Sequence, residues 1–279
     1  MSEHILPRFA GIVIPTTDNA FFSRLAVEAD RFLSRQGLTA LILSSDNSAE
    51  KEKEHLQTLL RLGAAGILCV SGLSALPEDL LPASYPLVFL DRHPRSAHPV
   101  PLVANDDRAA MFEATSYLIS LGCQHILLMP GYLAETRTSP RVIGYEEALL
   151  KNGLHPDPGY VLNRPGRQPS EVEAEALIRE IMHREQSVDA IITSSDRAAF
   201  GVITALHRVG LYVPEDVRLI CFDNSPYSSM ASPAITALDR QPDLLAEKAA
   251  RYLLDLMDGK AVPTETLIPV HLCKRDSTR

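Results

Sequence analysis

The sequence has no apolar run that approaches the roughly 18–20 residues a bilayer-spanning helix requires. Its opening residues, Met1–Phe9, lack the apolar core and small-residue cleavage site of a secretory leader. These two absences argue against a membrane protein and against export. We therefore expect a cytoplasmic protein that has no membrane partner.

Clustered positive charge is also missing. The 279 residues carry 27 Lys and Arg against 35 Asp and Glu, and no five-residue window is dominated by basic residues. A surface that grips a nucleic-acid backbone needs such clusters, so this segment is not expected to bind one by itself. The densest charge run, Glu50–Glu54, mixes both signs and is interpreted as a solvated helix face.

Cysteines are few, and three of the four lie in or beside apolar, strand-like runs, which is typical of buried, reduced thiols. They are Cys69, Cys123, Cys221 and Cys273. The sequence has no nucleotide-binding glycine loop, no G-x-S-x-G and no His–Cys metal spacing. An enzyme could still pair Asp223 with a histidine, but no histidine lies near Asp223 in the sequence. No catalytic residue, metal or cofactor is therefore predicted.

What the chain does have is an alternation of strand-like and helix-like segments. Predicted strands are Phe9–Ile14, Ala40–Ser44, Gly66–Val70, Leu87–Leu90, Leu102–Ala104, His125–Met129, Tyr160–Leu162, Ala190–Thr193, Leu219–Phe222 and Ile235–Leu238. Predicted helices include Phe21–Gln36, Glu50–Leu62, Asp107–Leu121, Val142–Asn152, Glu171–His183 and Leu244–Met257. This alternation predicts an α/β protein with parallel sheets flanked by helices, divided into two sets near Asn105-Asp106.

The most informative segment is Ile192–Pro226. It predicts a βαβ unit in which Ser195 and Asp196 follow one strand and Asp223 follows the next. In parallel α/β sheets the carboxyl ends of the strands are where ligands bind. The segment therefore points to a small-molecule pocket. Asp196 is expected to cap the helix that begins at Arg197, rather than to contact the ligand.

A series of short motifs, in order and with suitable spacing, resembles the effector-binding core of LacI/GalR-type bacterial transcriptional repressors. They are Ala10–Pro15, Asn19–Phe22, Ala65–Leu68, Phe89–Arg92, Val103–Asp107, Ser139–Tyr145, Ser195–Gly201, Gly210–Asp216, Cys221–Asn224, Pro233–Thr236 and Arg275–Thr278. Two positions depart from the family pattern, because Ser195 replaces an Asn and Cys221 replaces a Gly. The family's helix-turn-helix headpiece of about 60 residues has no counterpart in this sequence.

The resemblance implies two similar lobes of the periplasmic binding protein-like type, each with a parallel sheet flanked by helices, and a ligand cleft between them. It places 8–104 with about 242–262 in an N-terminal lobe, and 105–241 with about 263–279 in a C-terminal lobe. It further implies a homodimer that senses a sugar or sugar phosphate, and operator DNA that is bound only through the missing headpiece. A periplasmic sugar-binding protein of a transport or chemotaxis system, which shares the fold, is the alternative.

The resemblance also indicates ligand-binding positions. Arg141 matches the family's effector-contacting arginine, whose fork of donors suits hydroxyls, carboxylates or phosphates. Arg137, earlier in the same loop, is equally well explained as solvated or as a second positive charge that would favour an anionic ligand. Asp223 matches a carboxylate that accepts hydrogen bonds from ligand hydroxyls. Ser195 lacks the paired donor and acceptor of the usual Asn, so it cannot offer ligand hydroxyls the same pair of hydrogen bonds that the Asn offers.

The remaining candidates come from the other lobe and the crossing between lobes. Of Phe21 and Phe22, one ring is expected to be buried and the other to line the pocket. Asp91 and Arg92 end a strand, and at least one of them should reach the cleft or form a salt bridge across the lobes. Gln241 matches a glutamine at a lobe crossing that can reach the ligand. No aromatic residue lies in Arg164–Glu175, so the ligand should be smaller or more polar than a hexoside.

Overall fold

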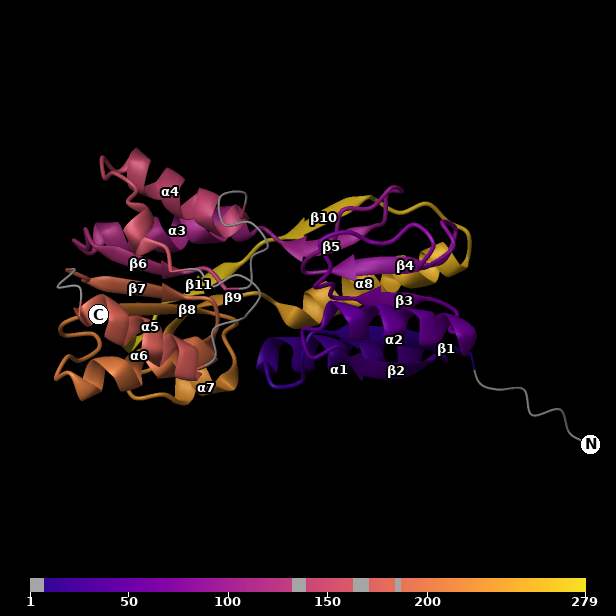
Figure 1. The fold of residues 1–279 in the computed structure, drawn as a ribbon, viewed down its shortest axis with the longest axis horizontal. Coiled ribbons are helices and arrows are strands. Elements are labelled where there is room, and N and C mark those ends of the chain that lie inside the picture. The colour runs from indigo at the N-terminus through magenta and orange to yellow at the C-terminus, as the bar shows by residue number, and fades with distance from the viewer. Residues whose placement is uncertain (1–7, 132–138, 163–170, 184–186) are drawn as a thin grey trace, which may run out of the picture. The chain divides into compact units, whose positions relative to one another are not determined.

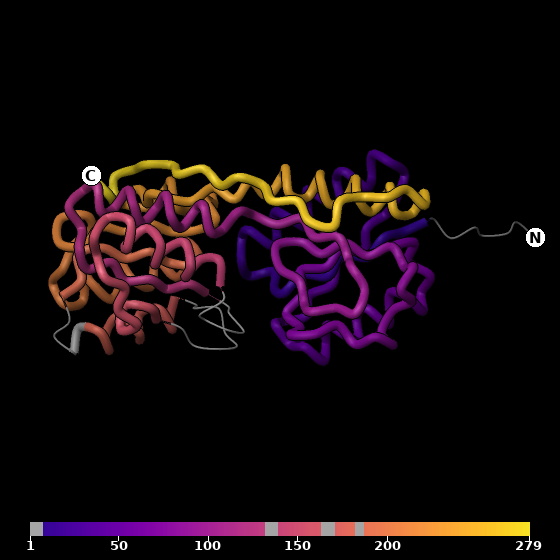
Figure 2. Tube along the Cα trace, turned by 90° about the horizontal axis from the view of Figure 1, so that it is seen from above, coloured from indigo at the N-terminus to yellow at the C-terminus, as the bar shows by residue number. Residues whose placement is uncertain are grey.

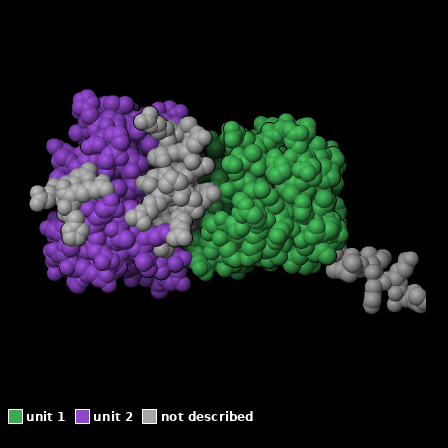
Figure 3. Space-filling view, in the orientation of Figure 1, with its two compact units in different colours: residues 1–105, 241–268 green, residues 106–240, 269–279 purple. Residues whose placement is uncertain are grey.

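The computed structural model describes residues 8–131, 139–162, 171–183 and 187–279. The chain forms two compact units, shown in different colours in Figure 3. Unit 1 comprises Met1–Asn105 and Gln241–Ile268, and unit 2 comprises Asp106–Arg240 and Pro269–Arg279. The chain therefore passes between the units at 105–106, 240–241 and 268–269, a path that can be followed in Figure 2. Within the described ranges, no helix is both long and apolar enough to cross a membrane.

Unit 1 is built on a parallel six-stranded sheet in the order β10-β5-β4-β3-β1-β2 (Figure 1). The strands are β1 (Phe9–Ile14), β2 (Thr39–Ser44), β3 (Ile67–Cys69), β4 (Leu87–Leu90), β5 (Leu102–Asn105) and β10 (Glu265–Ile268). Helices α1 (Ala20–Arg35) and α8 (Pro242–Met257) pack together over one face, and α2 (Ala49–Arg61) packs on the other. Successive strand residues point to opposite faces, so Ile12 and Ile14 enter one core and Val13 the other.

Unit 2 repeats this plan with a five-stranded sheet in the order β11-β9-β8-β7-β6, in which only β11 is antiparallel. The strands are β6 (Ile126–Met129), β7 (Ala190–Thr193), β8 (Arg218–Phe222), β9 (Thr236–Asp239) and β11 (His271–Cys273). The helices are α3 (Asp107–Ser120), α4 (Pro140–Lys151), α5 (Glu171–His183), α6 (Asp196–Arg208) and α7 (Pro226–Met230), with short 3-10 turns at Pro158–Tyr160 and Asp276–Thr278. The α3–α4 pair covers one face and the α5–α6 pair the other (Figure 1).

Two expectations about elements were wrong. The predicted strand Tyr160–Leu162 is not a strand, because Pro158–Tyr160 forms a 3-10 turn and only Val161 bridges Leu128. Residues from about 263 to 279, which include Leu267–Leu272, were expected to lie in the second lobe as a whole. Instead, β10 pairs with β5 in unit 1, and only β11 pairs with β9 in unit 2. Residues 263–268 therefore lie with unit 1, and the boundary falls at Ile268.

The C-terminal residues fasten the strands that carry the predicted site. Ser277 Oγ donates to the Leu219 carbonyl at 2.6 Å and accepts from the Thr236 amide at 2.8 Å, which ties β8 to β9. Arg275 Nη2 donates to Asn224 Oδ1 at 2.6 Å, just beyond the end of β8. The terminal R-D-S-T motif thus ties β8 to β9 through buried hydrogen bonds and contacts the loop that follows β8 through Arg275.

Candidate ligand-binding site

The carboxyl ends of β6, β7, β8 and β9 meet at one edge of the unit 2 sheet, which we call the unit 2 edge. The backbone turns sharply where β8 reaches it, because Asp223 has φ 91° and Asn224 has φ 53°. Asp and Asn tolerate this left-handed region better than other residues with a side chain. Such uncommon conformations cluster at binding sites, which is consistent with a functional edge.

Arg141 lies at the unit 2 edge in the first turn of α4, with only 12% of its side chain exposed. Its Nε donates to Asp107 Oδ2 at 2.7 Å, and Nη1 donates to the Pro130 carbonyl at 3.3 Å. The guanidinium carbon lies 3.8 Å from the centre of the Phe222 ring. A cation is disfavoured at a helix N-terminus, but Asp107, in the first turn of α3, supplies the compensating charge. Three separate contacts therefore fix the guanidinium.

Gly131 allows the β6 and β7 ends to approach each other beside this arginine. It has φ 96°, and a Cβ at this position would lie 2.7 Å from Ser194 Cβ and 3.7 Å from Arg141 Nη1. A side chain would therefore clash with Ser194 as well as adopt a strained backbone. The missing side chain lets both Ser194 and Arg141 approach the Gly131 backbone closely.

Asp223 forms a buried ion pair with Arg240, whose Nη1 lies 3.3 Å from Asp223 Oδ1. The two side chains are only 2% and 3% exposed. Burial, with added repulsion from the Asp196 and Asp223 carboxylates, raises the pKa of the Cys221 thiol far above its ordinary value. Cys221 therefore stays a neutral thiol between two strand-end acids.

The expected helix cap was assigned to the wrong residue. α6 begins at Asp196, and Ser195 is its N-cap, since Ser195 Oγ accepts from the Ala198 amide at 3.3 Å. Asp196 is 2% exposed, and its Oδ1 accepts from the Arg197 amide at 3.0 Å. Its Oδ2 is buried and has no hydrogen-bond partner among the described residues. Asp196 is thus freed from capping and remains a buried carboxylate at the unit 2 edge.

Unsatisfied polar atoms gather at this edge. Buried oxygens without a hydrogen-bond partner within the described residues occur there on the loops and helix starts that follow β5, β6, β7 and β8. They are Asp107 Oδ1, Ser139 Oγ, Asp196 Oδ2 and Ser225 Oγ. Buried polar atoms are normally hydrogen-bonded, so such a group calls for an explanation, and a ligand is one.

The candidate residues of unit 1 have a different character. Both Phe21 and Phe22 are buried, at 2% and 1% exposure, with ring centres 5.3 Å apart. That one of these rings lines a ligand pocket stays a prediction. The Arg92 guanidinium lies 5.8 Å from the Phe22 ring centre, and Asp91, at the end of β4, has φ 64°. Gln241, with φ 50°, is the N-cap residue of α8.

The charge run Glu50–Glu54 was expected to be a solvated helix face, but one of its residues is buried. Glu52 is 1% exposed and reaches the turn after β3, where Gly72 N donates to its Oε2 at 2.7 Å and the Ser71 hydroxyl donates to its Oε1. The Glu52 carboxylate thus accepts hydrogen bonds that a backbone carbonyl would otherwise accept from that turn. One member of the run therefore braces the carboxyl end of β3.

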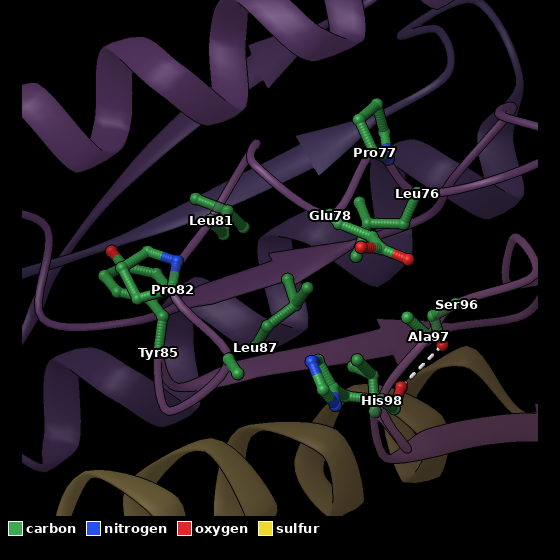
Figure 4. A pocket seen from close by; sticks show the side chains of 12 residues that line it. Leu76, Pro77, Glu78, Leu81, Pro82, Tyr85, Leu87, Ser96, Ala97 and His98 are labelled. Carbon is green, nitrogen blue, oxygen red and sulfur yellow. Dashed lines mark hydrogen bonds between the residues drawn. The ribbon is translucent and has the colours of Figure 1, made fainter.

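A hollow of about 430 Å³, open to solvent, lies elsewhere in unit 1 (Figure 4). Its wall is mostly apolar and includes Leu76, Leu87 and Tyr85. Tyr85 donates to the Ala64 carbonyl at 2.6 Å, and burial raises the pKa of its hydroxyl to about 12. None of the predicted site residues lines this hollow, so it is separate from the unit 2 edge.

The structure therefore brings Arg141, Ser195 and Asp223 to one edge of unit 2, while Phe21, Phe22, Asp91, Arg92 and Gln241 belong to unit 1. Arg137 lies outside the described residues. That these residues bind a ligand stays a prediction, as does a cleft between the lobes. Sequence reasoning missed Asp107 and Arg240, the ionic partners of Arg141 and Asp223. The only available signal was their position directly after strand-like runs.

Comparison with known proteins defines the class. The family model described as periplasmic binding protein-like domain matches residues 115–278, more than half of the chain. The chain therefore belongs to this family, and among its members it is a LacI-type regulator core.

Three relatives illustrate the likeness. The ribose operon repressor of Halalkalibacterium halodurans is 28% identical over 96% of this chain and 79% of its own length. The transcription regulator CcpA of Lactococcus lactis superposes with a TM-score of 0.87 at 26% identity, covering 98% of this chain and 100% of that one. A sugar-binding LacI-family regulator from Escherichia coli, solved with phosphate, has a TM-score of 0.79 at 25% identity and covers 96% and 97% of the two chains.

Proposed function

We propose that this chain is the small-molecule-sensing and dimerisation core of a LacI-type transcriptional regulator, that it acts in the cytoplasm and that it has no catalytic activity. The observation that carries the proposal is the unit 2 edge, where Arg141 is fixed by three contacts and four buried oxygens have no hydrogen-bond partner among the described residues. Relatives along nearly the whole chain are transcriptional regulators rather than transport proteins, which supports a regulatory role over the transport alternative.

The ligand would be a sugar or a sugar phosphate. An effector that binds one arrangement of the two units more tightly than another shifts the population toward that arrangement. In the full-length protein, this shift would alter the affinity of DNA-binding headpieces for an operator.

A thermal-shift screen of sugars and sugar phosphates tests the sensing role, because a ligand that binds only the folded state raises the melting temperature. A true effector should lose its shift in Arg141→Ala, which removes the fixed donors, and keep it in Arg108→Ala. Arg108 is a suitable control because it is exposed on α3 and pairs with Glu147. Equal shifts in both variants would remove Arg141 from the site.

One edge of the unit 1 sheet has no further strand paired to it among the described residues, and this edge supports a homodimer. β2 ends the sheet, and Leu41 and Ile42 on it are 37% and 38% exposed. Val27 on α1, which packs beside β2, is 41% exposed. An uncovered apolar edge strand invites pairing, and proteins normally protect it. We propose that a second copy of this chain covers it.

Sedimentation velocity can test this assignment. The wild-type chain should be a dimer at micromolar concentration, and the double variant Leu41→Lys/Ile42→Lys should be a monomer. Val172→Lys, which replaces a 70% exposed residue of unit 2, should leave the dimer intact. A wild-type chain that remains monomeric at high micromolar concentration would contradict the proposal.

A further inference from the structure

The positive charge of Arg141 is already matched within unit 2. Asp107 Oδ2 accepts from its Nε at 2.7 Å, and the two side chains are 12% and 20% exposed. The next arginine along the edge, Arg240, is matched by Asp223 in the buried pair described above. Asp196 adds a further buried carboxylate. Arg275, which donates to Asn224 just beyond β8, is a third arginine there. Three arginines are thus matched in number by three carboxylates, and the described part of the edge has no surplus of positive charge to offer an anion.

The hydrogen-bonding groups at the edge are mixed in kind. A guanidinium has five N–H donors, and the bonds of Arg141 to Asp107 and to the Pro130 carbonyl use two of them, so three remain for a ligand. The unit 2 edge also carries Asp107 Oδ1 and Asp196 Oδ2, both buried acceptors without a partner in the described ranges. A ligand that satisfies the whole edge must accept hydrogen bonds and also donate them.

We propose that Asp107 is a specificity-determining residue that makes this edge select uncharged, hydroxyl-rich ligands over their phosphorylated forms. The inference rests on the proposed function and narrows its ligand class. A sugar hydroxyl can accept from Arg141 and donate to Asp107 Oδ1 at the same time. A phosphate ester carries about −1.5 to −2 charges at pH 7 and offers only acceptors when fully ionised. The phosphate group would be repelled by the carboxylates of Asp107 and Asp196. It could also donate no hydrogen bond to their unpartnered oxygens.

The first test uses inorganic phosphate as the probe and isothermal titration calorimetry at constant ionic strength. Asp107→Asn keeps the shape of the side chain and removes its charge, so phosphate should bind this variant at least about tenfold more tightly than the wild type. The double variant Asp107→Asn/Arg141→Ala should lose that gain. Asp107→Ser is a second variant that removes the same charge if the Asn form folds poorly.

Glu147→Gln is the matched control. Glu147 lies on α4 and pairs with Arg108 of α3, so its removal takes the same charge from the same helix pair at an exposed site. The Glu147→Gln variant should bind phosphate as weakly as the wild type. The proposal is overturned if wild type and Asp107→Asn bind phosphate equally, or if Glu147→Gln gains as much as Asp107→Asn.

The second test separates this inference from the proposed function. D-ribose and D-ribose 5-phosphate, and D-glucose and D-glucose 6-phosphate, are titrated into the wild type as matched pairs. A phosphate ester that binds more tightly than its parent sugar, and through Arg141, overturns the selectivity but supports sensing. Sugar binding that Arg141→Ala does not weaken counts against the proposed function, and the phosphate comparison then still decides the role of Asp107.

Discussion

The two units share a parallel sheet covered by helices, but the residues at the carboxyl ends of their strands differ. In unit 2 these ends carry two ion pairs and several buried oxygens without a partner within the described ranges. In unit 1 they carry a buried aromatic pair and Glu52, whose carboxylate accepts from neutral donors. Unit 1 also has an apolar edge strand, β2. Under the two proposals above, the same architecture serves ligand selection in unit 2 and subunit association in unit 1.

The largest expected effect concerns the buried ion pair of unit 2. Asp223→Ala leaves Arg240 as an uncompensated charge that is 3% exposed, which should lower the free energy of unfolding by about 3–5 kcal/mol. Asp255→Ala, which breaks an exposed ion pair with Lys260 in unit 1, should leave the urea midpoint unchanged. Equal midpoints for the two variants would show that the Asp223–Arg240 pair does not stabilise unit 2.

Helix packing gives a second contrast. α4 approaches α3 so closely at Gly144 that a Cβ there would lie 2.1 Å from the Arg108 carbonyl oxygen, whereas α1 and α8 pack through alanines such as Ala29 and Ala249. Gly144→Ala should therefore destabilise the protein by about 2–3 kcal/mol through overpacking. Ala249→Gly in unit 1 should cost about 1 kcal/mol, mainly in helix propensity. A urea titration in which Ala249→Gly loses more unfolding free energy than Gly144→Ala would refute the close approach of α4 to α3 at Gly144.

The smallest effect is expected at Glu52. Its partners are neutral, so Glu52→Gln keeps one carbonyl acceptor for Gly72 N or the Ser71 hydroxyl and should cost only about 1–2 kcal/mol. The same denaturation measurement checks it, with Glu54→Gln on the exposed part of α2 as the control. If Glu52→Gln lost as much free energy of unfolding as Asp223→Ala, the carboxylate with neutral partners in unit 1 would matter as much for stability as the ion-paired carboxylate in unit 2.

The sequence was a good guide where one local pattern decides the structure. The strands Phe9–Ile14, Leu87–Leu90 and Ala190–Thr193 have the predicted bounds, because short apolar runs between turn residues form buried parallel strands. Asp223 was found in the same way, because it directly follows such a run, whereas Arg141 was chosen because it matches the family's effector-contacting arginine. Their positions at the unit 2 edge follow from the parallel order of the strands.

The features that sequence reasoning missed depend on contacts between distant segments. The pairing of Asp107 with Arg141 joins residues 34 positions apart, and the burial of Glu52 depends on a turn 20 residues later. The choice of Ser195 over Asp196 as the cap was a local competition between two good capping residues. The division of Leu267–Leu272 between the two sheets depended on which open sheet edge each half meets.

Hydrogen–deuterium exchange with and without a sugar found in the screen tests the central claim most directly, namely that the unit 2 edge binds the ligand. Amides that follow the strands there, including those of Gly131, Arg141–Tyr145 and Asp196–Ala198, should exchange more slowly when the sugar is present. Amides at the opposite end of the same sheet, such as Gln124 and His125, should not change. Protection confined to that opposite end, or to the hollow around Leu76 and Tyr85, would contradict the account.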